Sequence, residues 1–213
     1  MPAAVVRTLL ALLLLAAVTW SAVTADPFVF VNFFGFFTIQ SNLVGAAVLL
    51  AGAVRTARGT PLTTAWSAVR WIATTDLVIV GVVYWTLLAP LETPAGIASW
   101  TNLVLHGVGP AAMLLDWLLV RDRVRLPIRL LPLVLVYPIV WIAVVLVRGA
   151  TDGWVPYPFL DPDQGYGVVW GWVAVIAGVF ALVGALLRLV ARRGPADPQI
   201  PRGSAAPARH AES

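Results

Sequence analysis

Six long apolar segments, separated by more polar connections, dominate the hydrophobic pattern of the chain. A helix needs roughly 20 apolar residues to cross the hydrocarbon core of a bilayer, and each segment is close to that length. Helices are expected because every backbone N–H and C=O group in lipid must be paired within its own segment. The pattern predicts an all-α, polytopic membrane protein whose six-helix domain covers residues 1–193. The segments are residues 4–24, 33–54, 68–89, 98–120, 130–148 and 167–190.

The composition supports a membrane protein. Hydrophobic residues make up 60% of the chain and charged residues 11%, whereas soluble domains carry about 25% charged residues. The chain has no Lys, and its 14 basic residues are all Arg. They lie at the ends of apolar segments instead of on a basic face, which argues against nucleic acid as a partner. The absence of Cys excludes disulfides, thiolate metal sites and a Cys nucleophile.

The Arg residues lie almost entirely on one side of the predicted bundle. The connections 25–32, 90–97 and 149–166 contain none, and 13 of the 14 lie in the alternate connections, at the adjoining ends of the spans and in the tail. Arg148 is the exception. The positive-inside rule therefore predicts a cell-membrane protein with both termini in the cytoplasm. Residues 194–213, rich in Pro, Ala and Arg, are expected to form a disordered cytoplasmic tail.

Two features leave alternatives open. Arg7, the leucine-rich run after it and Val23-Thr24-Ala25 also fit a cleaved signal peptide, whose removal would not change the topology of the other spans. The 149–166 connection contains aromatic residues, Pro and acids. It is expected either to cap the outer face or to form an interfacial aromatic belt.

Polar side chains inside the spans are costly, so they mark candidate sites. The second span opens with FFGFFTIQSN, in which Thr38 and Asn42 are four residues apart and share one helix face. The fourth opens with TNLVLHGVGP, in which Asn102 and His106 are also four apart. At 1.5 Å per residue, Thr38 and His106 both lie on the order of 10 Å below the outer boundary. The two side chains are therefore able to meet.

A Thr hydroxyl next to an imidazole has a definite chemical use. His106 is expected to take the proton of Thr38 as its oxygen attacks an acyl carbon. Asn42, Asn102 or Ser41 would then donate to the oxyanion or orient the reacting groups. The structural alternative is that these side chains bond to backbone or link helices, as Thr, Asn and His often do in membranes.

Two acids also lie within the spans. Asp76 and Asp116 are predicted to form structural ion pairs, with Arg70 and Arg121 as the nearest partners in sequence. A proton or ion relay is the alternative use of buried acids.

The segments FFGFFTIQSN and NLVLHGVGPAAMLLDWLL resemble the bacterial six-helix membrane proteins related to the eukaryotic androgen-induced-gene family. The eukaryotic members are intramembrane threonine hydrolases that cleave fatty acid esters of hydroxy fatty acids. The resemblance covers most of residues 1–190 in topology and about thirty residues in motif. Thr38 matches the family's Thr early in the second span, and His106 and Pro110 match its His and Pro in the fourth.

The resemblance implies an intramembrane lipid-ester hydrolase that forms an acyl-threonine intermediate and needs no metal or cofactor. Membrane lipids and a fatty-acyl ester are the expected partners. A non-catalytic membrane scaffold, or a small-solute or proton-coupled transporter, are the alternatives. Transporter sites usually lie near the midplane, whereas the polar residues here form an outer and an inner group.

Overall fold

A computed structural model describes residues 2–192, 194 and 195. The described chain is all-helical, and six of its helices are long and apolar enough to cross a membrane, which confirms the predicted class. Their ends lie within four residues of the predicted ones. The predicted tail lies outside the described residues except for Gly194 and Pro195. The six spans are Pro2–Val23, Phe37–Ala57, Thr64–Leu91, Trp100–Leu119, Ile128–Thr151 and Tyr166–Ala191.

Three of the spans are not regular α-helices throughout. The third continues from an α-helix into one turn of π-helix, Tyr84–Leu88, and a 3₁₀ turn, Ala89–Leu91. The fourth is broken in the middle by a second π turn, Val104–Val108. The fifth begins with a 3₁₀ turn, Ile128–Leu130, before α8. The α-helices are α1 (Pro2–Val23), α2 (Phe30–Phe33), α3 (Phe37–Ala57), α4 (Thr64–Val83), α5 (Pro94–Ile97), α6 (Trp100–Leu103), α7 (Gly109–Leu119), α8 (Leu133–Thr151) and α9 (Tyr166–Ala191).

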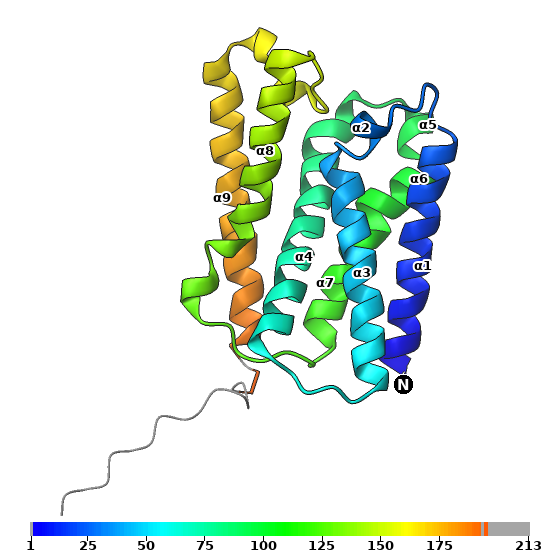
Figure 1. Ribbon diagram of the computed structural model, residues 1–213, viewed down its shortest axis with the longest axis vertical. Helices are drawn as coiled ribbons and strands as arrows, with labels where there is room; N and C mark the ends of the chain where they lie inside the picture. Colours follow the sequence, from blue (N-terminus) through cyan, green and yellow to red (C-terminus); the bar gives the residue numbers. More distant parts are fainter. Residues whose placement is uncertain (1, 193, 196–213) are drawn as a thin grey trace, which may run out of the picture.

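Helices α3 and α4 form the centre of the bundle (Figure 1). Helix α1 packs along α3, α7 packs against α4, and the α8–α9 hairpin joins the opposite side, mainly through α4. The N-terminus and the end of α9 lie at the same end of the bundle, as an even number of spans requires (Figure 1). That this end faces the cytoplasm remains a prediction from the Arg distribution.

The outer surface of α8 is suited to lipid. Large apolar side chains face outward there, and more than half of each is exposed. Exposure of so continuous an apolar stripe to water would be unfavourable, whereas its contact with the hydrocarbon core of a bilayer would not. The protein is therefore embedded in a membrane. The exposed side chains of α8 are Val136, Ile139, Val140, Val144 and Val147.

Helix α1 belongs to the core of the bundle. Ala11, Leu14, Ala17 and Val18 are buried against α3 and its neighbours. Its Arg7 is 1% exposed, although it is the sixth of the 22 residues of an apolar helix. Cleavage after Ala25, the alternative raised by the sequence, would remove these buried side chains from the bundle.

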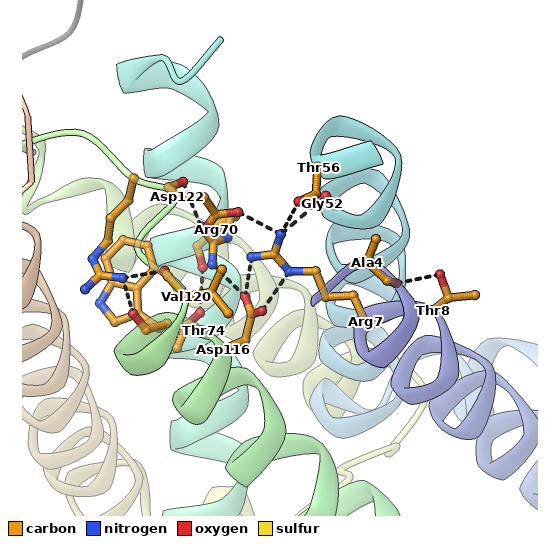
Figure 2. A network of polar contacts seen from close by, with 12 residues as sticks. Ala4, Arg7, Thr8, Gly52, Thr56, Arg70, Thr74, Asp116, Val120 and Asp122 are labelled. Carbon is orange, nitrogen blue, oxygen red and sulfur yellow. Dashed lines mark hydrogen bonds and ion pairs between the residues drawn. The ribbon is translucent and has the colours of Figure 1, made fainter. Parts of the chain in front are cut away.

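Arg7 enters a network of four charges at the end of the bundle where the chain begins (Figure 2). It binds Asp116 through two nitrogens, at 2.7 and 3.1 Å, and Asp122 at 2.7 Å. Arg70 binds the same two acids, at 2.6 Å for Asp116. The predicted pairing of Asp116 with Arg70 is confirmed, whereas Arg121 is exposed and forms no ion pair within the described chain. The network ties α1, α4, α7 and the segment after α7 together.

The predicted ion pair of Asp76 is wrong. This side chain is 3% exposed, none of the ion pairs among the described residues involves it, and its Oδ1 atom has no hydrogen-bond partner. Asp76 lies six residues further along α4 than Arg70. Arg70 is instead held by Asp116 and Asp122, so it is not available to Asp76.

Candidate active site

Thr38 lies at the start of α3, where the chain turns back into the membrane. The short helix α2 ends at Phe33, and α3 begins at Phe37 after a break at Gly35. Gly35 is required there because a Cβ atom would lie 2.4 Å from the Trp154 side chain of the outer connection. Thr38 is the second residue of α3 and is 9% exposed. Its side chain is therefore buried near one end of the bundle, in the first turn of α3.

His106 lies in the π turn of the fourth span, and Pro110 explains part of that geometry. Pro110 has no N–H to donate to the carbonyl of His106, its partner in a regular α-helix. Trp85 supplies the missing donor, with Nε1 at 2.9 Å from that carbonyl oxygen. π turns of this kind are frequent at functional sites because they reposition side chains that a regular helix would place elsewhere.

The two candidate catalytic side chains meet. Thr38 Oγ1 lies 3.2 Å from His106 Nε2, and His106 Nδ1 lies 3.2 Å from the carbonyl oxygen of Asn102. A carbonyl only accepts hydrogen bonds, so in the neutral imidazole Nδ1 carries the hydrogen and Nε2 is left as an acceptor. The Thr38 hydroxyl therefore donates to His106, which is the arrangement that a general base requires.

Tyr84 fixes the plane of the imidazole. Its ring stacks on His106 with 4.0 Å between centroids and 19° between planes. The amide nitrogen of Asn102 donates to the Tyr84 hydroxyl and to the carbonyl of Gly96, at 3.2 Å for the latter. Both amide hydrogens of Asn102 are thus in use, and the residue orients both Tyr84 and His106. Sequence reasoning missed Tyr84, whose position opposite His106 depends on how α4 packs against the fourth span.

Asn42 joins α3 to the π turn. Its amide nitrogen donates to the carbonyl of Thr38 at 2.9 Å and to that of Leu105 at 3.1 Å. In a regular helix Gly109 N–H would bond to Leu105, but here it donates to Val104. Asn42 thus satisfies a carbonyl that the π turn leaves free. Its two hydrogens are in use, so the geometry favours an orienting role over oxyanion binding.

Ser41 and Gln40 face away from His106, toward α8. The hydroxyl of Tyr137 donates to Gln40 Oε1 at 2.6 Å. Ser41 Oγ lies near the same Tyr137 hydroxyl without forming a hydrogen bond of normal geometry. The structure therefore does not bring Ser41, a predicted oxyanion or orienting residue, to the Thr38–His106 pair.

An apolar cavity of about 100 Å³ adjoins Thr38. One water needs roughly 10–15 Å³ measured in this way, so the space is large enough for part of a hydrocarbon chain. Its walls come from α3, α4, α8, α9 and the outer connection, and the hydroxyl groups in its lining belong to Thr38, Tyr84 and Tyr157. It reaches from Leu160 in the outer connection to Leu135 near the start of α8.

The outer connection between α8 and α9 packs over this region. Tyr157 lies with its hydroxyl 3.5 Å from Thr38 Oγ1 and accepts a hydrogen bond from the Thr38 backbone N–H at 3.4 Å. Its ring contacts Phe36, Trp141 and Phe159. Of the two alternatives for this connection, the geometry favours the cap. Sequence reasoning did not single out Tyr157; the aromatic and Pro content of the connection was the available signal.

Asp and Glu side chains do not gather near the pair. In residues 2–192, 194 and 195, no three His, Asp or Glu side chains lie close enough together to hold a metal ion. Comparison with known proteins adds no family, because the chain matches no protein-family model, no curated protein and no solved structure.

Proposed function

We propose that this protein is an intramembrane hydrolase of lipid esters, with Thr38 as nucleophile and His106 as general base. One observation carries the proposal. The Thr38 hydroxyl lies 3.2 Å from an imidazole nitrogen that is left as an acceptor by the hydrogen bond on the other side of the ring. This is the relation between a nucleophile, its base and an orienting group that covalent catalysis requires.

The proposed reaction has two steps. His106 Nε2 takes the Thr38 proton while Oγ1 bonds to the ester carbonyl carbon, and the alcohol leaves with that proton. Water then attacks the acyl-threonine and gives a proton to His106, and the fatty acid departs as Oγ1 regains its hydrogen. The Asn102 carbonyl and the Tyr84 ring support the imidazole through both steps, because they hold Nδ1–H and the plane of the ring.

The apolar cavity supports a fatty-acyl substrate. It begins at Thr38 and continues between α4, α8 and α9, so an ester carbonyl at Thr38 would have its acyl chain among hydrocarbon side chains. Counted from water, each methylene that the bilayer and then the cavity bury contributes about 0.8 kcal/mol. Esters of medium and long acyl chains are therefore expected to be hydrolysed with a higher kcat/KM than acetyl esters. Membership of the androgen-induced-gene family is part of the same hypothesis.

The test is hydrolysis of fluorogenic acyl esters by the purified protein in detergent or liposomes. The proposal predicts activity in the wild type, and a fall to background in Thr38→Ala and His106→Ala. Thr75→Ala is a matched control, because Thr75 is a buried Thr whose hydroxyl donates to the carbonyl of Trp71 in its own helix. Activity that survives Thr38→Ala would reject the nucleophile assignment.

The scaffold and transporter alternatives predict other results. A non-catalytic scaffold predicts no hydrolysis by the wild type and changes in stability alone in the Thr38 and His106 variants. The transporter alternative depends on Asp76, the buried acid without an ion pair, instead of on the Thr38–His106 pair. It predicts that Asp76→Asn stops solute or proton movement in liposomes. It also predicts that neither the wild type nor this variant hydrolyses esters.

A further inference from the structure

Attack on an ester places negative charge on the carbonyl oxygen, and that oxygen needs hydrogen-bond donors about 2.7–3.1 Å away. The residues predicted for this role from sequence do not supply them. Both amide hydrogens of Asn42 go to backbone carbonyls, and those of Asn102 go to Tyr84 and Gly96. Ser41 faces Tyr137. The donor must come from elsewhere.

Tyr157 brings a hydroxyl to the right place. Its oxygen lies 3.5 Å from Thr38 Oγ1, on the side of Thr38 that adjoins the cavity. That oxygen already accepts the Thr38 backbone N–H at 3.4 Å, so the phenolic hydrogen points away from the backbone. Because Thr38 Oγ1 gives its own hydrogen to His106, the Tyr157 hydrogen is directed at Oγ1 and at the space beside it.

The hydroxyl is held in place before any substrate arrives. The Tyr157 ring stacks on Phe159 at 5.4 Å and 11°, and it contacts Trp141 at 5.8 Å. The connection that carries it is held against the segment before α3. Trp154 packs on Gly35, and Arg148, near the end of α8, donates to Asn32 at 2.7 Å. A donor fixed in this way does not have to reorganise during the reaction, which is the main source of oxyanion stabilisation.

We propose that Tyr157 is a catalytic residue of this hydrolase, whose hydroxyl donates to the ester carbonyl oxygen as Thr38 Oγ1 bonds to the carbonyl carbon. No proton is transferred from Tyr157, and the bond strengthens as charge develops on the oxygen. This inference rests on the proposed function. It also assigns the outer connection a direct part in catalysis, besides covering the cavity.

The protonation state of the Tyr157 phenol is compatible with its role as a hydrogen-bond donor. Burial raises the pKa of its phenol above the ordinary value, so the hydroxyl keeps its hydrogen at neutral pH. The carbonyl oxygen of the bound ester would face the outer connection, and the acyl chain would extend from Thr38 toward Leu135.

The test is Tyr157→Phe, which removes only the hydroxyl and keeps the ring packing. With an ester that the wild type hydrolyses, kcat is expected to fall about 10²–10³-fold with KM little changed, as for loss of one oxyanion donor. Tyr137→Phe is the matched control, since it removes a phenol of α8 that bonds Gln40 instead of Thr38. Its kcat is expected to equal that of the wild type.

A second measurement separates catalysis from structure. An acyl trifluoromethyl ketone forms an oxyanion adduct with Thr38, whereas the matching methyl ketone binds without one. Tyr157→Phe is expected to weaken binding of the first by the same factor as kcat/KM and to leave the second unchanged. Equal loss of both ligands, or full kcat in Tyr157→Phe, would overturn the role of Tyr157 alone. No hydrolysis by the wild type would overturn the proposed function as well.

Discussion

Thr38 Oγ1 and His106 Nε2 lie 3.2 Å apart, although 68 residues separate them in the chain. Two local features produce this contact. The break at Gly35 starts α3 late enough to leave Thr38 near the helix end, and the π turn of the fourth span places His106 opposite it. Asn42 joins the two, because its amide donates to the carbonyl of Thr38 and to that of Leu105, the residue before His106. The pair therefore depends on how closely α3 approaches the π turn.

Gly109 tests that dependence. A Cβ atom at Gly109 would lie 2.8 Å from Asn42 Oδ1 and 2.9 Å from the Leu14 side chain. Gly109→Ala is expected to push α3 away from the π turn, to cost about 1–3 kcal/mol and to reduce ester hydrolysis. Gly107→Ala is the control, because Gly107 lies in the π turn itself, two residues before Gly109, with nothing within 4 Å of the added Cβ. Equal melting temperatures and activities in the two variants would contradict this account of the packing.

The four-charge network is expected to hold α1 in the bundle. Asp116→Asn leaves the guanidinium groups of Arg7 and Arg70 with less compensating charge in a buried position. Breaking a buried pair by removing one partner costs roughly 3–5 kcal/mol, so the melting temperature should fall markedly. Asp163→Asn, on the exposed outer connection, is the control. A network that stabilises nothing would give the two variants the same melting temperature.

Replacement of Asp76 is expected to affect stability in the opposite direction from replacement of Asp116. Its buried carboxyl group has no cation partner in the described part of the chain, so a neutral amide of the same shape should fit at no electrostatic cost. Asp76→Asn should keep or raise the melting temperature and leave ester hydrolysis unchanged. Thermal unfolding and the fluorogenic assay measure both. A large loss of stability would show that the carboxyl group has a partner in the membrane.

The helices were well predicted from the sequence because lipid restricts the backbone conformations that a membrane-spanning segment can adopt. An apolar segment of about 20 residues in a bilayer must be helical, and the number and order of the spans follow. The contact between Thr38 and His106 was also predictable, since polar groups inside the spans are costly and similar depth limits where they can meet. Arg7 was not predicted to be a partner of Asp116, although burying an Arg in an apolar helix costs as much free energy as burying an Asp.

Other parts of the site could not be predicted, because they depend on packing between distant segments. The π turn leaves the Leu105 carbonyl free, and only the structure shows that Asn42 takes it. Tyr84, at the start of the π turn of the third span, stacks on His106 of the fourth. Tyr157 reaches Thr38 from a connection 119 residues away. Hydrophobic periodicity carries no information on any of these contacts.

The most direct measurement is the position of a fluorophosphonate adduct, found by mass spectrometry of peptides from the labelled, purified protein. Fluorophosphonates react with hydroxyl nucleophiles that a neighbouring base activates. The account predicts an adduct on the peptide that contains Thr38, its absence in Thr38→Ala and its strong reduction in His106→Ala. An adduct on another residue, or labelling of Thr38→Ala equal to that of the wild type, would contradict the Thr38–His106 hydrolase.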